Sequence, residues 1–103
     1  MHIIIFITAS SKLEAAKIAE KLVKQRLAAC VNIVGRIESL FWWQGKVDKA
    51  NEVLLIVKSR KEKLAKIIKA VKSAHSYEVP EIIALPIISG YAPYLEWINE
   101  SLR

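Results

Sequence analysis

Cysteine, aspartate, glycine and proline are scarce in this chain of 103 residues. A single cysteine, Cys30, excludes an intrachain disulfide and any CxxC zinc or redox motif. Only three glycines and three prolines, with 53% hydrophobic residues, exclude a disordered or low-complexity protein. No apolar run approaches the roughly 18 to 20 residues that a membrane span requires. These absences predict one ordered domain, residues 1–103, with a core of its own.

Motifs of the common enzyme classes are absent too. The single aspartate, Asp48, lies just beyond a predicted turn, where a polar residue is expected. The chain contains no Ser-His-Asp arrangement, no Walker loop and no GxGxxG motif. The sequence therefore predicts a protein that is not an enzyme.

The formal net charge is +6, which alone could attract anionic partners. Sheets of the topology predicted below bind RNA through aromatics on central strands, whereas this chain offers Leu54, Leu55 and Ile56 there. The lysines of the second predicted helix are most simply a solvated face, and we expect neither a nucleic-acid nor a membrane partner. The Lys-rich, Asp-poor composition hints at a thermophilic source.

Hydrophobic periodicity and breaker residues define the expected elements. A near-continuous apolar run at residues 2–8 predicts a strand buried on both faces or at a subunit contact. The N-terminus lacks a basic n-region and a small-residue cleavage site, which favours a strand over a signal peptide. A cytoplasmic location is therefore expected. Ser11 and Glu14 form a capping box for a helix from Leu13 to about Leu27. Further strands are predicted at 29–43, 46–59 and 81–88, and further helices from about 61 to about 75 and from Pro93 onward.

This order, βαββαβ followed by a helix, predicts an α+β, ferredoxin-like split βαβ fold with two helices on one face of an antiparallel sheet. Gln44 and Gly45 are the expected hairpin turn. Pro86 places the last strand at an edge or a bulge.

The strand from Ala29 to Trp43 is long for so small a domain. Fifteen residues at about 3.3 Å each would extend roughly 50 Å, whereas a domain of this size has a radius of gyration near 13 Å. We expect another subunit to cover the overhang, because its apolar side chains would otherwise form an exposed ribbon. The alternative is a bend, for example at Gly35, that folds the aromatics back onto the chain's own helices. The outer apolar residues are Ile37, Leu40, Phe41, Trp42 and Trp43.

Several sequence blocks, in order, resemble the CutA, or divalent-cation-tolerance, family. They are AACVNI at 28–33, FWWQGKV at 41–47, Glu52, Lys58, HSYEVPEII at 75–83 and YLEWI at 94–98. The resemblance implies a ferredoxin-like protomer in a homotrimer whose sheets interlock through long hairpins, with Phe41, Trp42 and Trp43 at the interface. It also implies an association with copper and other divalent cations, and no reaction.

The metal ligands that the resemblance implies are poorly retained. The corresponding positions are Ile7, Ala74 and His75, of which only His75 can bind a metal. His75 could instead bond a free carbonyl at the helix end. Cys30 would suit Cu(I) as a thiolate, but a cysteine within a strand is more often a small buried hydrophobe. Because the family is associated with metal tolerance, the resemblance still implies copper or another divalent cation as the cofactor. His75 and Cys30 are the candidate ligands.

The resemblance also implies a polar and aromatic cluster in clefts between subunits, formed by Trp43, Lys58, Tyr77 and Glu81. Such a cluster could bind a small ligand. It could equally be a buried salt bridge that fixes the register of the trimer. Three functions therefore stay open: a metal-related homotrimer, a small-molecule sensor resembling the trimeric PII signalling proteins, and a structural scaffold.

Overall fold

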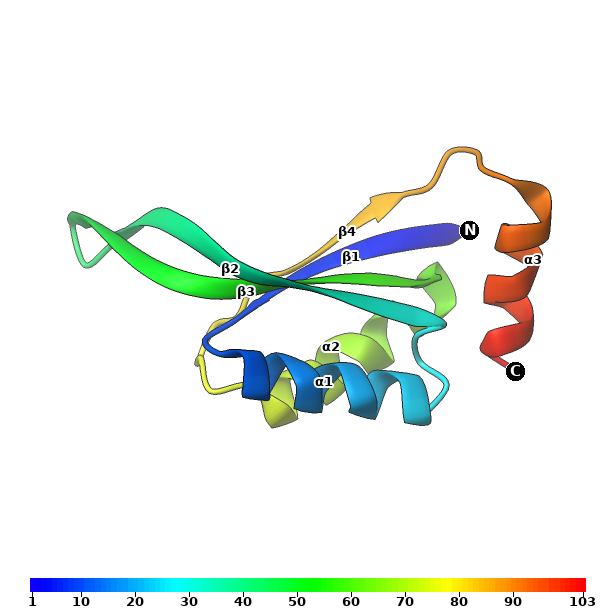
Figure 1. Ribbon diagram of the computed structural model, residues 1–103, viewed down its shortest axis with the longest axis horizontal. Helices are drawn as coiled ribbons and strands as arrows, with labels where there is room; N and C mark the ends of the chain where they lie inside the picture. The colour runs from blue at the N-terminus through cyan, green and yellow to red at the C-terminus, as the bar shows by residue number, and fades with distance from the viewer.

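A four-stranded antiparallel sheet and a layer of two helices form the body of the molecule, as the computed structural model of residues 1–103 shows (Figure 1). A third helix covers one end, and a long hairpin projects from the other. The elements are β1 (His2–Ala9), α1 (Lys12–Lys24), β2 (Cys30–Trp43), β3 (Lys46–Arg60), a 3-10 turn η1 (Lys61–Lys63), α2 (Leu64–Ala74), β4 (Ile82–Pro86) and α3 (Ala92–Ser101).

The strand order is β2-β3-β1-β4, and every neighbouring pair is antiparallel. The predicted ferredoxin-like fold, with its additional C-terminal helix, is confirmed. Pro86 ends β4, which is an edge strand, as the sequence predicted. No helix combines the length and the hydrophobicity that a membrane crossing requires.

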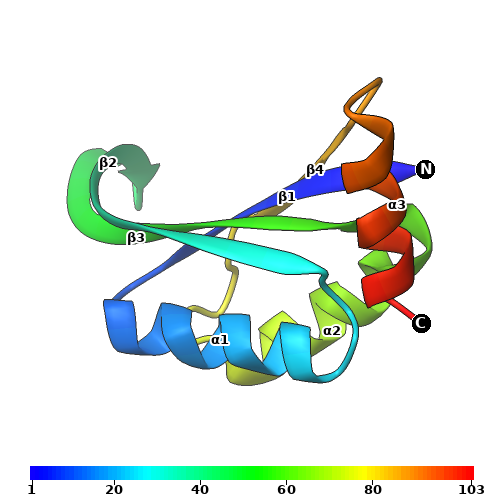
Figure 2. The same cartoon turned by 45° about the vertical axis from the view of Figure 1, so that its right-hand side comes forward.

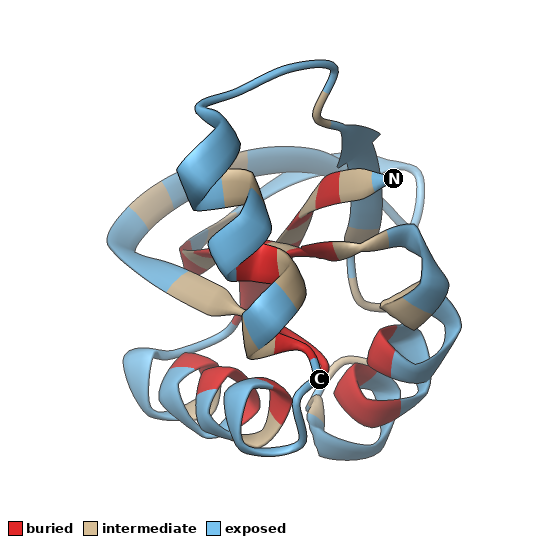
Figure 3. Ribbon diagram, turned by 90° about the vertical axis from the view of Figure 1, so that its right-hand side faces the viewer, coloured by how far each residue is buried: buried red, intermediate tan, exposed pale blue.

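The core lies between the sheet and the α1–α2 layer, where the buried positions concentrate (Figure 3). Alternate residues of β1 and β3 point toward the helices and are at most 6% exposed. The intervening residues of β1, such as Ile4 and Phe6, are only half-buried. Of the two predicted alternatives, burial of the first strand on both faces does not hold within one chain, because no helix packs on the centre of the second face. A subunit contact on that face stays a prediction. The core positions of the two strands are Ile3, Ile5, Ile7, Val53, Leu55 and Val57.

Helix α1 begins as predicted but ends earlier. The Ser11 hydroxyl accepts a hydrogen bond from the Glu14 amide at 3.1 Å, which satisfies one free donor of the first turn. At the other end Arg26 takes a positive φ of 60°, and the Leu27 amide bonds back to the Leu22 carbonyl. Leu27 is buried although it lies beyond the helix, so the apolar pattern continues past the point where the backbone turns.

The β2–β3 hairpin extends well beyond the helix layer and curves at its far end (Figure 2). Gln44 and Gly45 form its turn with φ values of 51° and 78°, the left-handed pair that two-residue hairpins favour. A register shift lies between Val34 and Ile37, with Arg36 at a φ of 55°, so the strand bends where the sequence suggested it could. The longest dimension of the molecule is 45 Å, against 25 and 23 Å for the other two.

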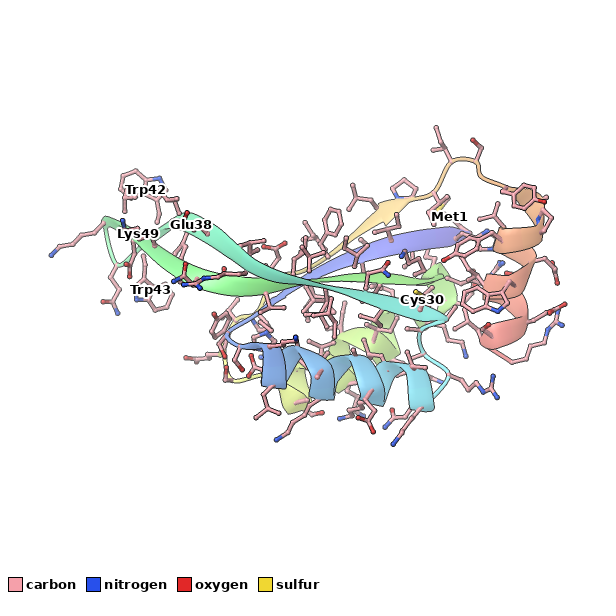
Figure 4. The ribbon with its side chains drawn as sticks, in the orientation of Figure 1. Met1, Cys30, Glu38, Trp42, Trp43 and Lys49 are labelled. Atoms are coloured by element: carbon pink, nitrogen blue, oxygen red, sulfur yellow. The ribbon has the colours of Figure 1, made fainter.

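The bend does not return the aromatics to the body of the same chain. Trp42 is 76% exposed and Trp43 59%. Their side chains point to opposite sides of the hairpin (Figure 4). The tip is therefore apolar on both faces in a single chain.

Candidate functional site

A polar network joins the start of α1, the end of α2 and the middle of β3. Its titratable members are Glu14, His75, Tyr77 and Glu52. Only His75 and Tyr77 were candidates from the sequence. The two glutamates enter because the fold brings residues far apart in the chain into hydrogen-bond contact.

His75 is the centre of this network, and its side chain is 0% exposed. Its Nε2 lies 2.7 Å from the Thr8 carbonyl, and its Nδ1 lies 3.0 Å from the Tyr77 amide. Because an amide only donates and a carbonyl only accepts, Nδ1 is the acceptor and Nε2 carries the proton. Neither nitrogen keeps a free lone pair, so the imidazole as placed cannot bind a metal. His75 holds the chain after α2 against the end of β1.

Glu14 supports the same junction from the first turn of α1. Its carboxylate accepts hydrogen bonds from the Ser10 amide at 3.0 Å and the Ser76 amide at 2.9 Å. Burial alone would raise the pKa of Glu14, but the hydrogen bonds from Ser76 and Ser10 and the nearby His75 lower it to about 2. The expected capping box is thus altered, because the carboxylate bonds Ser10 and not Ser11, and then crosses to the segment after α2.

Glu52 is the member of the network that has the most unusual environment. It is 8% exposed, and its Oε2 accepts a hydrogen bond of 2.8 Å from the Tyr77 hydroxyl. No lysine or arginine of the same chain pairs with it. Burial, followed by this contact with Glu52, raises the pKa of Tyr77 to about 12. The sequence signals for Glu52 were its place among the residues that resemble the family and its position directly before the apolar centre of β3.

Cys30 lies at the opposite end of the sheet. It is half-buried, it pairs across the strands with Lys58, and Tyr94 of α3 lies beside it. Lys58 in turn bonds the Asn32 side-chain oxygen. The His75 contact at Thr8 lies at the level of Leu54, four residues from Lys58 along β3, or about 13 Å. Cys30 and His75 cannot share an ion within one chain.

The cluster expected between subunits is also not assembled within one chain. Trp43 pairs with Lys46 at the hairpin tip, twelve residues along β3 from Lys58. Tyr77 contacts Glu52, and Glu81 is exposed without an ion-pair partner. Bringing Trp43 to Lys58 or Tyr77 would require a second copy of the chain.

The donor set of a single chain does not fit a metal ion. No group of three or more His, Cys, Asp and Glu side chains is arranged to hold one. His2, the other histidine, bonds through one ring nitrogen: its Nε2 contacts the Leu95 carbonyl at 3.1 Å and the Asn99 side-chain oxygen at 2.9 Å. His2 belongs to no group of three potential ligands.

An apolar surface covers the side of the sheet opposite to α1 and α2. Its residues share one face, because directly paired residues in antiparallel strands point the same way. Helix α3 covers only the end near His2, and the centre is open (Figure 1). We call this surface the open face, and its apolar members are Ile4, Phe6, Val34, Leu54, Ile56, Ile83 and Leu85. The same register places the polar residues Thr8, Asn32 and Lys58 on this face. Val34, Ile83 and Leu85 are 41%, 52% and 43% exposed.

Comparison with known proteins gives consistent results over the whole chain. Residues 3–101 match the family model described as CutA1 divalent ion tolerance protein. A divalent-cation tolerance protein CutA from Archaeoglobus fulgidus is 49% identical over 103 residues, covering all of both chains. Its namesake from Thermus thermophilus is 46% identical over 101 residues and covers 98% of each chain.

Solved structures agree with the fold. The structure described as the periplasmic divalent cation tolerance protein CutA from Archaeoglobus fulgidus superposes with a TM-score of 0.97 at 48% identity, over 100% of both chains. That of Cut A1 from Thermus thermophilus gives 0.97 at 46% identity over 98% of each. The family match spans nearly the full sequence, and the two relatives named have nearly the same length and the same topology. The chain spans only 57% of the length of another relative, the chloroplastic protein CutA 1 from Oryza sativa. This chain therefore belongs to the CutA1 divalent ion tolerance family.

Proposed function

We propose that this CutA protein acts as a non-enzymatic, cytoplasmic homotrimer in the response to divalent cations, and that assembly through the open face and the β2–β3 hairpin creates its functional surface. The carrying observation is the open face itself. A sheet whose second side is lined mainly by apolar side chains, with two unpaired edge strands, is a template for association.

The exposure of the hairpin is an independent argument for the same proposal. Its outer half contributes nothing to the core of its own chain, and all residues from Leu40 to Lys49 are exposed. A two-stranded ribbon with both faces in water is at best marginally stable. Packing Phe41, Trp42 and Trp43 against a neighbouring chain would remove this apolar area from water and stabilise the ribbon.

Metal ions enter this proposal only through the assembly. The bonding of His75 and the separation of Cys30 argue against a tight copper site in one chain. We propose that copper or another divalent cation associates with groups that only several copies bring together, and that His75 contributes by holding the fold at the α2 end.

A second candidate is a sensor that binds a small molecule in the clefts between subunits. Glu52 favours it, because a buried carboxylate with one hydrogen bond and no cation in its own chain is energetically incomplete. A cationic group of a ligand, or of a neighbouring copy, would complete it. Lys58, Tyr77, Glu81 and a neighbour's Trp43 could line the same cleft.

Substitutions on the two sides of the molecule test the assembly. Ile83→Asp places a charge on the open face, where we expect the protein to elute from a sizing column as a smaller species. Leu13→Asp is the matched control, because Leu13 is also exposed, at 68%, but lies on α1. Equal elution of Ile83→Asp and the unmodified protein at micromolar concentration would contradict the proposed interface.

A further inference from the structure

The net positive charge of this protein is confined to one layer. The α1 segment and the β3–α2 segment, residues 12–26 and 60–75, contain eleven Lys and Arg against three Glu, a formal charge of +8. The rest of the chain has five Lys and Arg against seven acidic residues, a formal charge of −2. The layer lies on the side of the sheet opposite to the open face (Figure 1). It therefore stays accessible in the proposed assembly.

Most lysines of this layer have no partner. Of its nine lysines, only Lys24 forms an ion pair with a carboxylate, at 2.5 Å from Glu20. Lys21 bonds Ser73, and Lys72 bonds the Glu78 carbonyl, contacts that leave their charges unneutralised. The side chains of the remaining six form no hydrogen bond or ion pair: Lys12, Lys17, Lys61, Lys63, Lys66 and Lys69.

The arrangement on α2 is unfavourable for the helix itself. The helix contains no acidic residue, and Lys66, Lys69 and Lys72 follow one another at a spacing of three, where like charges repel by about 0.2–0.5 kcal/mol per pair. Lys61 and Lys63 precede its positive N-terminal end, and no side chain caps that end. A surface that served stability alone would alternate Lys with Glu. The like charges and the uncapped end of α2 cost stability, and no contact within the fold offsets that cost. Such an uncompensated cost indicates a functional surface.

We propose that this basic layer binds the phosphate backbone of double-stranded nucleic acid without reading its sequence. Neither helix carries an aromatic residue on which an unpaired base could stack. The exposed cations of α2 are lysines, which contact phosphates as point charges, and no Arg, Asn or Gln of α2 could read a base edge. Sequence alone indicated a merely solvated face, because it did not show which lysines lack partners.

A membrane surface fits these observations less well. A helix that lies on lipid must expose an apolar face to the acyl chains. The apolar faces of α1 and α2 are already used in the core, where Ile18, Leu22, Ile67 and Val71 are at most 1% exposed.

Fluorescence anisotropy with a labelled 24-base-pair DNA duplex tests the proposal on the full chain. We expect saturable binding at about 50 mM salt that weakens steeply by about 200 mM, because bound phosphates release counterions. The double variant Lys66→Gln/Lys69→Gln should lower the magnitude of the salt slope by about 2 and weaken binding at least about tenfold. An RNA duplex of the same sequence should bind within about tenfold of the DNA, since only the backbone is contacted.

The matched control removes the same charge elsewhere. Lys46→Gln/Lys49→Gln on the hairpin should change duplex affinity less than about twofold at the same salt, provided that its sedimentation mass equals that of the unmodified protein. Circular dichroism of both variants verifies that they are folded. No binding at low salt, equal losses in the two variants, or tighter binding to phosphatidylserine vesicles than to the duplex would each overturn the proposal.

Discussion

The Tyr77 hydroxyl donates a hydrogen bond of 2.8 Å to Glu52 Oε2, joining the segment after α2 to the middle of β3. Twenty-five residues separate the two in the chain. The bond supplies the single protein donor of a buried carboxylate, and it fixes the path by which the chain passes from the helix layer to the edge strand β4.

Removing this donor should destabilise the protein. Tyr77→Phe leaves Glu52 buried without a hydrogen bond, which we expect to lower the free energy of unfolding by about 1–3 kcal/mol. Urea unfolding at one fixed protein concentration measures the change. Tyr91→Phe is the control, because Tyr91 is 76% exposed and its hydroxyl bonds nothing. Equal stability of both variants would mean that the Tyr77–Glu52 bond contributes nothing net.

Acid should weaken the junction held by Glu14. Its pKa is lowered to about 2 in the folded chain from an ordinary 4.5, so the unfolded chain binds its proton first as the pH falls. The contribution of Glu14 is therefore complete above pH 4.5 and is lost as the pH falls toward 2, by at most about 3 kcal/mol.

Thermal unfolding of Glu14→Gln tests this directly, because Gln keeps an acceptor but does not titrate. We expect the variant to be less stable than the unmodified protein at pH 6, and the two melting temperatures to converge toward pH 2. Parallel curves across that range would contradict the assigned role of the Glu14 carboxylate.

The hairpin turn should depend on glycine at only one of two nearby positions. Gly45 has a φ of 78°, which an L-residue adopts at a cost of about 1–2 kcal/mol, so Gly45→Ala should lower stability by about that amount. Gly35→Ala should be near neutral, since a Cβ there meets nothing within 4 Å. Chemical unfolding of the pair measures the difference, and equal effects would show that the turn is not formed as described.

Metal titration should separate the fold role of His75 from ligation. Calorimetric titrations with Cu²⁺, Ni²⁺ and Zn²⁺ compare His75→Ala with the unmodified protein, with Cys30 reduced in both. Any saturable metal binding of the unmodified protein should be kept in the variant. The same variant should unfold at lower urea, because the Thr8 carbonyl and the Tyr77 amide lose their shared partner. Abolished metal binding with unchanged stability would reverse this assignment.

Local patterns were sufficient to predict the order of the elements. The period of α2, the Gln44-Gly45 turn and the position of Pro86 each follow from the physics of a few adjacent residues. The end of α1 did not, because Leu27 continues the apolar pattern although the backbone reverses at Arg26. Periodicity records which residues are buried, and a buried residue just beyond a helix looks like one within it.

The candidate site was less predictable, because its contacts join distant residues. Glu14 looked like a local cap, but its carboxylate also binds the amide of Ser76, 62 residues away. Glu52 gave two signals, its place in the family resemblance and a charge beside an apolar strand centre, and neither predicted its bond to Tyr77. Trp43 and Lys58 belong to one expected cluster, but Trp43 pairs with Lys46, twelve residues along β3 from Lys58, so only contacts between chains could unite them.

Sedimentation equilibrium of the unmodified protein, over a dilution series down to micromolar concentration, is the decisive measurement. A homotrimer predicts a mass about three times the 11.6 kDa of one chain. Trp43→Asp should shift the series toward lower mass, because it places a charge at the hairpin tip. A mass of 11.6 kDa for the unmodified protein at all concentrations would contradict the account.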